Sequence, residues 1–152
     1  MGAYIMKFLH IFFVILFLGN IIIAVFWKRH GDKSNNPAII AYTLRGVIKA
    51  DRLFTMPGVA GLLIFGFGAM GLMGYPFTTG WILWSLVLFV ISGAAFMAKV
   101  VPIQKKLLAI AEAPEFNNAE YEKLSKQWEL WGSVATITPI IAAILMVLKV
   151  PL

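Results

Sequence analysis

Four long apolar segments alternate with polar segments along the chain. They cover residues 4–27, 53–73, 81–98 and 132–148. A helix needs about 20 predominantly apolar residues to cross the hydrocarbon core of a bilayer, and all four segments are close to that length. Backbone N–H and C=O groups in lipid must be paired within the segment, so each segment is expected to be a helix. The pattern predicts an all-α integral membrane four-helix bundle that forms a single domain over residues 1–152.

The polar connection before the second span contains an amphipathic helix. Asn36-Pro37 is typical of a helix start, with proline at the first helical position. An apolar stripe at helical spacing follows, and it consists of Ile40, Leu44, Val47 and Ile48. Such a helix is expected to lie at the cytoplasmic membrane surface and to lead into the second span. Pro57 is expected to kink the helix where it enters the membrane.

A second amphipathic helix precedes the fourth span. Asn117 and Glu120 are spaced as in a capping box at a helix start. Four apolar or aromatic residues then share one helix face: Tyr121, Leu124, Trp128 and Trp131. We expect this helix, too, to lie on the cytoplasmic surface of the membrane.

Composition supports a membrane protein over a soluble one. Hydrophobic residues make up 61% of the chain and charged residues only 13%, whereas a soluble domain has about 25% charged residues. The net charge is +6, which basic cytoplasmic loops explain more simply than a nucleic-acid partner does. The chain has no cysteine, which excludes disulfides, iron–sulfur clusters and thiolate ligation of haem.

The distribution of Lys and Arg predicts the orientation in the membrane. Eleven of these residues lie in the first and third connections, and only Lys7 and Lys149 lie on the opposite side. The positive-inside rule therefore predicts a multi-pass protein of the inner cell membrane with both termini outside the cytoplasm. The first segment is expected to remain as a span, because it is longer than a signal-peptide core and ends in Trp27-Lys28-Arg29-His30.

His10 is the main candidate for a cofactor or metal ligand. It lies about 9 Å into the first span, counted from Tyr4 at 1.5 Å per residue. An ionisable residue at such a depth indicates function, and a neutral imidazole can ligate haem iron or another metal. The structural alternative is a histidine that hydrogen-bonds to the backbone of a neighbouring helix.

A second haem ligand would have to come from a methionine, because no second histidine lies within a span. His–Met ligation is known in cytochromes. The methionines near the depth of His10 are Met70, Met73 and Met146, whereas Met56 and Met97 are too far toward the cytoplasm. Methionine also fills gaps in apolar packing, so packing is the competing interpretation.

Other polar residues flank or interrupt the spans. Asn20 is a lone amide in mid-membrane, for which an interhelical hydrogen bond is the default expectation. Asp51 lies beside a basic stripe that consists of Arg45, Lys49 and Arg52. Asp51 could form half of an ion or proton site, but a counter-ion to the stripe is the commoner role. Lys49 could hold a haem propionate or an anionic lipid.

Several segments together resemble one family of predicted integral membrane proteins, domain of unknown function 2269, over nearly the whole chain. They are Lys7-Phe8-Leu9-His10, Ala50 to Gly58, Gly74-Tyr75-Pro76, Trp81 to Leu86, Gln104, Tyr121, Trp128, Trp131-Gly132 and Pro151. The family resemblance implies four spans and no particular activity.

More distantly, the architecture resembles the membrane-bound protoporphyrinogen oxidase and copper-resistance D groups. The oxidase group also has Leu-His near the start of its first span, proposed to bind haem, and His10 matches that position. The resemblance therefore implies a haem ligand at His10. The third span here reads Trp84-Ser85-Leu86-Val87-Leu88, without the His and basic residue of the oxidase's later motif.

The sequence thus leads to a first hypothesis of a b-type haem protein with a redox or haem-handling role. The main alternative is a small transporter or an assembly subunit without a cofactor, and a further one is a protein that handles metal ions. The bilayer is the expected partner, together with a second copy or a larger membrane complex. We expect any ligand site to lie toward the outer leaflet, beneath the turn from Gly74 to Gly80.

Overall fold

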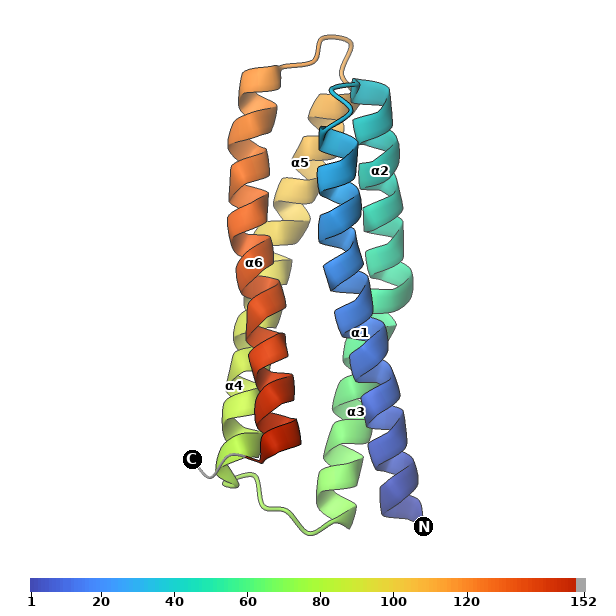
Figure 1. Cartoon of the computed structure of the whole chain (residues 1–152), viewed down its shortest axis with the longest axis vertical. Helices are drawn as coiled ribbons and strands as arrows, with labels where there is room; N and C mark the ends of the chain where they lie inside the picture. The colour runs from blue at the N-terminus through green and yellow to red at the C-terminus, as the bar shows by residue number, and fades with distance from the viewer. Residues whose placement is uncertain (150–152) are drawn as a thin grey trace.

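The computed structural model, described for residues 1–149, consists of long helices that run nearly parallel to one axis (Figure 1). In chain order, the elements are α1 (Gly2–Asp32), α2 (Pro37–Ala50), η1 (Asp51–Thr55), α3 (Met56–Leu72), α4 (Gly80–Ala95), η2 (Phe96–Val100), α5 (Val101–Glu112) and α6 (Asn118–Leu148). The elements η1 and η2 are π-helical turns without a break on either side, so α2–η1–α3 and α4–η2–α5 are continuous helices. The fold is therefore all-α, with four long helices.

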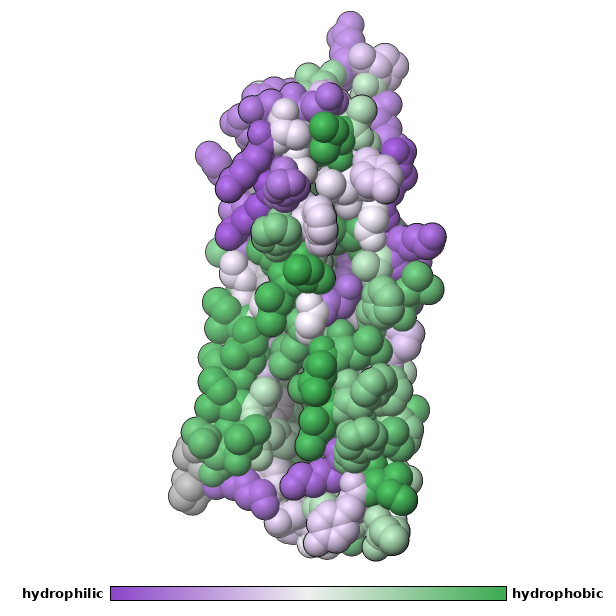
Figure 2. Space-filling model, turned by 45° about the vertical axis from the view of Figure 1, so that its right-hand side comes forward, coloured by the Kyte–Doolittle hydropathy of each residue, from purple (hydrophilic) through white to green (hydrophobic). Residues whose placement is uncertain are grey.

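All four long helices have the length and the apolar composition needed to cross a membrane, and they span Gly2–Asp32, Pro37–Leu72, Gly80–Glu112 and Asn118–Leu148. A 36-residue helix such as Pro37–Leu72 is about 54 Å long, well beyond a hydrocarbon core of about 30 Å. Figure 2 shows an apolar surface over one part of the molecule and a polar surface over the other. We call the part formed by α2, α5, the end of α1 and the start of α6 the polar end.

The amphipathic helices do not lie on the membrane surface, contrary to the prediction. Helix α2 continues into α3 along the same direction, and the predicted helix before the fourth span is simply the first part of α6 (Figure 1). Helix α5, which continues the third span, was not predicted from the sequence. The apolar stripes of the two predicted helices are buried against each other in the polar end, and they do not face lipid.

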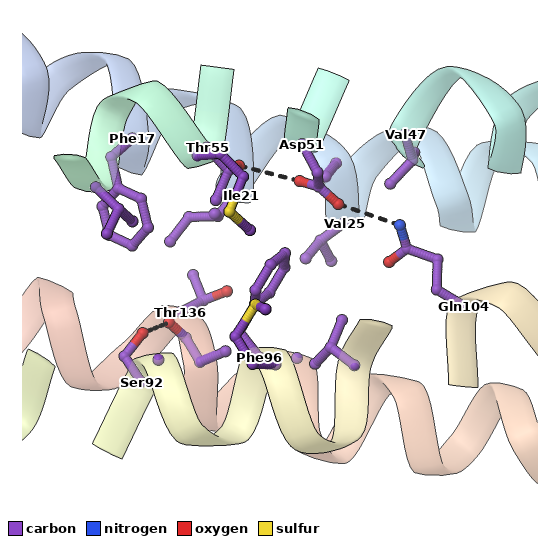
Figure 3. Close-up of a pocket in the computed structure, with 18 of the residues that line it drawn as sticks. Phe17, Ile21, Val25, Val47, Asp51, Thr55, Ser92, Phe96, Gln104 and Thr136 are labelled. Atoms are coloured by element: carbon purple, nitrogen blue, oxygen red, sulfur yellow. Dashed lines mark hydrogen bonds between the residues drawn. The ribbon is translucent and has the colours of Figure 1, made fainter. Parts of the chain in front are cut away.

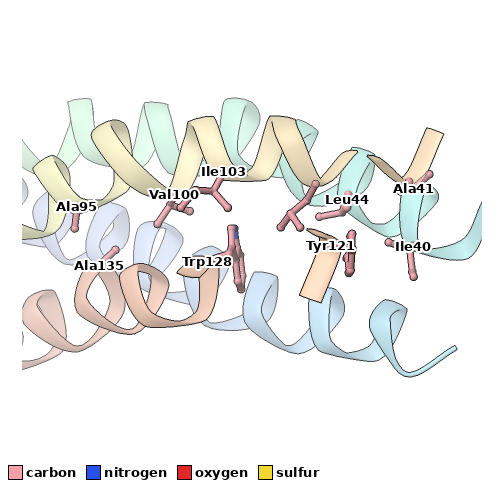
Figure 4. Packing of buried hydrophobic residues seen from close by; sticks show 11 residues of the cluster. Ile40, Ala41, Leu44, Ala95, Val100, Ile103, Tyr121, Trp128 and Ala135 are labelled. Carbon is pink, nitrogen blue, oxygen red and sulfur yellow. The ribbon is translucent and has the colours of Figure 1, made fainter. Parts of the chain in front are cut away.

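The core of the polar end consists of residues from three helices packed together (Figure 4). Leu44 of α2 and Leu107 of α5 are completely buried, and Tyr121 and Trp128 of α6 pack in the same cluster. Arg45 and Glu112 form an exposed ion pair that joins α2 to α5 at 2.6 Å. Burial of this cluster explains why the polar end is compact.

The membrane half is divided into two helix pairs. Helix α1 packs along α3, and α4 packs along α6, and the rings of Phe17 and Phe89 make a contact between the two pairs. Within the described elements, α3 and α4 do not pack against each other. The Gly61 backbone lies directly under the Phe13 ring, and Gly58 lies against Phe17, which lets α1 approach α3 closely. Ser85 and Ser92 donate hydrogen bonds to carbonyls of α6.

The helix ends follow local sequence signals. Asn36 caps α2 by accepting a hydrogen bond from the Ala38 N–H at 2.9 Å, with Pro37 at the first helical position, as predicted. The Asn117 side chain accepts from the Glu120 N–H at 3.1 Å, which confirms the predicted cap. Helix α3 ends in a Schellman motif around Gly74, whose positive φ of 72° favours glycine.

Proline accounts for the position of both π turns. Pro57 follows η1 and Pro102 follows η2, each at the start of the next α-helix. In each turn an N–H bonds five residues back, from Met56 to Asp51 and from Val101 to Phe96. Proline cannot donate and crowds the preceding turn, so a widened turn relieves the clash. The structure thus has a widened turn just before Pro57, where the sequence predicted a kink.

Candidate functional site

A cluster of buried polar side chains lies where the polar end meets the membrane half. Asn20 of α1 donates to Asp51 Oδ1 at 3.2 Å and to Thr55 Oγ1 at 2.8 Å. Thr55 donates to the same Asp51 Oδ1 at 3.0 Å, and Gln104 of α5 donates to Asp51 Oδ2 at 3.1 Å. Trp128 of α6 completes the cluster by donating its indole N–H to Gln104 Oε1 at 3.1 Å. All four long helices therefore contribute a side chain to this cluster.

Trp128 determines how the Gln104 amide is oriented. An indole N–H can only donate, so the oxygen of the Gln104 amide must face Trp128. The amide nitrogen of Gln104 then faces Asp51, and every side chain that contacts the carboxyl group donates to it. Such an arrangement suits an ionised carboxylate, because a protonated carboxyl would need an acceptor.

No cation compensates Asp51 within residues 1–149. The ion pairs in this part of the chain are Lys28 with Asp32, Arg29 with Glu129 and Arg45 with Glu112. Asp51 itself is only 7% exposed. Burial of a carboxylate without a counter-ion destabilises the folded protein. The presence of Asp51 at this position therefore suggests a function.

A cavity of about 170 Å³ opens beside Asp51, between the two helix pairs (Figure 3). Asp51, Thr55 and Gln104 supply polar groups to it, and Trp128 also lines it. Its walls are otherwise mainly apolar, and three more aromatic side chains line them: Phe17, Phe89 and Phe96. An apolar cavity of about 150 Å³ is large enough for benzene, so a molecule with one aromatic ring could enter this one.

The cavity extends to the side of the molecule that faces lipid. Met56, Gly93 and Met97 line it, and all three are exposed on the surface. Met56 belongs to α3 and Gly93 to α4, the two helices that do not pack against each other in the described elements. We call the opening lined by these three residues the lateral mouth. A ligand dissolved in the bilayer could reach Asp51 through it.

The depth of the site follows from α1. Asn20 precedes Trp27 by seven residues, which corresponds to about 10 Å along the helix. Trp27 and Phe26 are exposed apolar rings at the boundary of the apolar zone. The cavity beside Asp51 therefore lies within the membrane, near its boundary with the polar end. A ligand site beneath the turn from Gly74 to Gly80 stays a prediction.

A second polar cluster lies deeper in the polar end. Lys28 is completely buried and forms an ion pair with Asp32 at 2.6 Å. The Lys28 ammonium also donates to Ser125, and its nitrogen lies 5.2 Å from the ring centre of Trp128. Tyr121 donates to Asp32 at 2.6 Å. Burial and the hydrogen bond to Asp32 both raise the pKa of Tyr121, so the phenol remains protonated.

Trp128 links the two polar clusters. Its N–H contacts Gln104 of the Asp51 cluster, and its ring lies beside the Lys28 ammonium of the second cluster. Polar groups thus form a nearly continuous series from Asp32 to the cavity. Lys28 is buried in this series, whereas its neighbours Arg29 and His30 are exposed.

The structure corrects the role expected for Asp51. Its carboxylate points into the bundle and does not serve as counter-ion to the basic stripe. Arg45, Lys49 and Arg52 are all exposed, and Arg45 pairs with Glu112 instead. Asn20 does form the expected interhelical hydrogen bonds, with Asp51 and Thr55 as partners.

His10 lies about ten residues from this site along α1 and packs against α3. Its Nδ1 is 2.8 Å from the carbonyl oxygen of Leu62, and the ring covers Gly66. Since a carbonyl oxygen can only accept, the neutral ring carries its proton on Nδ1 and leaves Nε2 with a free lone pair. This is the backbone contact that we had considered as the structural alternative, and it is also the tautomer that a metal-ligating histidine adopts.

The predicted partners of His10 remain untested as ligands. Met70 and Met73 lie near the end of α3 and Met146 near the end of α6, and all three are half-buried. None of them lines the cavity beside Asp51, and neither does His10. Within residues 1–149, no group of three His, Asp or Glu side chains is arranged to hold a metal ion.

These observations define an integral membrane protein with four long transmembrane helices and a buried polar site between them. The chain belongs to the family of predicted integral membrane proteins called DUF2269, whose model matches residues 4–150. The match confirms the family resemblance noted in the sequence, although Pro151 lies outside the described residues. No curated protein matches the chain. No solved structure matches it either.

Proposed function

We propose that this protein is a small membrane transporter whose binding site is the cavity between the two helix pairs. The observation that carries the proposal is the lateral mouth, which connects a cavity containing polar groups directly with the lipid-facing surface. A purely structural bundle would be expected to close such a gap with side chains.

The helix arrangement supports movement of one pair against the other. Within the described elements α3 and α4 do not pack against each other, whereas the polar end is tightly packed. The π turns η1 and η2 lie where these two regions join, and each contributes at least two residues to the cavity wall. Turns of this kind frequently occur at functional sites. Separation of the pairs about the polar end would widen the lateral mouth and open the cavity toward the opposite end of the bundle.

Flux measurements with blocked variants test this proposal. The purified chain in proteoliposomes should carry a single-ring ion, either benzyltrimethylammonium or benzenesulfonate, faster than protein-free vesicles do. Gly93→Trp should abolish that flux, because Gly93 lines the lateral mouth and a Cβ there meets open space. Gly19→Trp is the matched control, since Gly19 is another helical glycine with open space but lies outside the cavity. If neither ion crosses, or if both variants behave alike, the proposal is wrong.

We also propose that the protein is inserted in the inner cell membrane with the polar end in the cytoplasm. This orientation rests on the excess of Lys and Arg in the two connections at that end. A C-terminal alkaline phosphatase fusion should then be active. An inactive fusion combined with a fluorescent cytoplasmic reporter would reverse the orientation.

A second candidate function, binding of b-type haem, is favoured by the hydrogen bond of His10. The bond from Nδ1 to Leu62 leaves Nε2 with a lone pair that could ligate the iron of a bound haem. Bound haem would supply electron-transfer chemistry, and His10 would hold and orient it.

An absorption spectrum tests haem binding independently of transport. Protein purified in mild detergent from haem-replete cells should show a Soret band, and His10→Ala should lose it. His30→Ala is the control, because His30 is exposed at the other end of α1. A colourless wild-type preparation would exclude the haem hypothesis and leave the transport hypothesis unaffected.

A further inference from the structure

The cavity is lined by an acidic side chain and by no basic side chain. Twenty residues line the cavity, and Asp51 is the only one of them with an ionisable side chain. The basic side chains nearest to it in sequence are directed elsewhere: Lys49 and Arg52 are exposed, and Lys28 is paired with Asp32. Lys99, on the opposite helix, lies 5.5 Å from the ring centre of Trp131. A ligand in the cavity therefore encounters negative charge and no positive charge from these residues.

The carboxylate retains capacity for one more contact. Oδ1 accepts from Asn20 and Thr55, whereas Oδ2 accepts only from Gln104. Each carboxylate oxygen can accept about two hydrogen bonds, so Oδ2 has an acceptor position left. Because Asp51 lines the cavity, a ligand there can approach its carboxylate.

The aromatic walls favour the same sign of charge. Four aromatic residues line the cavity: Phe17, Phe89, Phe96 and Trp128. The ring centres of Phe17 and Phe89 lie 5.6 Å apart. Aromatic ring faces attract cations such as quaternary ammonium groups and do not attract anions. Met56 and Met97 add polarizable sulfur atoms at the lateral mouth.

We infer that the ligand of this cavity is a small lipophilic monovalent cation, with Asp51 as its counter-charge. The inference rests on the proposed transport function and specifies the substrate class for the same site. Asn20, Thr55 and Gln104 position the carboxylate, and the aromatic residues enclose the apolar part of the cation. Entry through the lateral mouth requires a molecule that dissolves in lipid, which accounts for the apolar lining.

Selectivity between ions of opposite charge tests the inference in the wild-type chain. Proteoliposomes should carry benzyltrimethylammonium and should not carry benzenesulfonate, an anion of similar size. Protein-dependent flux of both ions, or of the anion alone, would overturn the cation inference while leaving transport through the cavity intact. Absence of any flux would instead overturn the proposed function.

Substitution of Asp51 provides the second test. Asp51→Asn should lower flux and equilibrium binding of benzyltrimethylammonium on the order of thirtyfold, as expected when one partner of a buried charge pair is removed. Asp51→Glu keeps the charge and should retain cation selectivity. Glu112→Gln removes an exposed carboxylate of the polar end and should change nothing. Unchanged cation binding by a folded Asp51→Asn protein would refute the role of Asp51.

Discussion

Lys28→Ala will lower the free energy of unfolding by about 3 kcal/mol or more, the loss expected when a buried ion pair is broken. Lys28 is completely buried and contacts Asp32, Ser125 and the ring of Trp128. Alanine removes the cation and also leaves an empty space inside the polar end. The loss is measured by denaturant titration in mixed micelles, followed by far-ultraviolet circular dichroism.

Two control variants separate charge from volume at this position. Lys28→Met keeps most of the side-chain volume and should destabilise less than alanine does, because it removes the charge without leaving an empty space. Arg29→Ala removes a neighbouring cation whose ion pair with Glu129 is exposed, and should change stability by less than about 1 kcal/mol. Equal stability of the Lys28→Ala and Arg29→Ala proteins would show that the buried pair contributes nothing.

Trp128→Ala is expected to destabilise the protein by about 3–5 kcal/mol, as for other large-to-small substitutions in a core. Trp128 is 3% exposed and packs in the core of the polar end, where it also joins the two polar clusters. The same titration measures this effect. Loss of the indole should also free the Gln104 amide to rotate, so binding at Asp51 should weaken.

Trp128→Phe distinguishes the hydrogen bond from the packing. Phenylalanine keeps a ring in the core but cannot donate to Gln104, so a smaller loss of about 1–2 kcal/mol is expected. Leu130→Ala is the control on the same helix, because Leu130 is 62% exposed, and a change within about 0.5 kcal/mol is expected there. A Trp128→Ala protein as stable as the Leu130→Ala protein would contradict this account.

Much of the fold could be predicted because membrane helices depend on local features. Length, apolar composition and the caps at Asn36 and Asn117 are properties of short segments, and the structure confirms them. The packing partner of an apolar stripe cannot be predicted from such local features. The stripe containing Leu44 suits a membrane surface equally well, and only the tertiary structure shows that it packs with Leu107. The surface placement of the amphipathic helices was wrong for this reason.

The candidate site could have been found in part from helical spacing. Asp51 follows Val47 by four residues and Leu44 by seven, so it shares the buried face of that helix. Lys49 and Arg52 lie on other faces, although they are closer to Asp51 in sequence. Proximity in sequence suggested a counter-ion, whereas the periodicity indicated a buried carboxylate.

Gln104 and Trp128 could not have been assigned to the site from the sequence. Both come from helices that join the cluster only through the tertiary structure, and Gln104 lies 53 positions after Asp51 in the sequence. The π turns were equally inaccessible, because proline predicts a disturbance of the helix but not its form. His10 was identified from its type and depth, and its contact with Leu62 defines its tautomer.

The lateral mouth also affects how ligand affinity should be measured. Since Met56, Gly93 and Met97 face hydrocarbon, the cavity samples solute from the bilayer and not directly from water. The relevant concentration is then the aqueous concentration multiplied by the partition coefficient of the solute. Two compounds that make identical contacts with Asp51 would differ in apparent dissociation constant by the ratio of their partition coefficients. Affinities referred to water would rank compounds by their solubility in lipid as much as by their fit to the site.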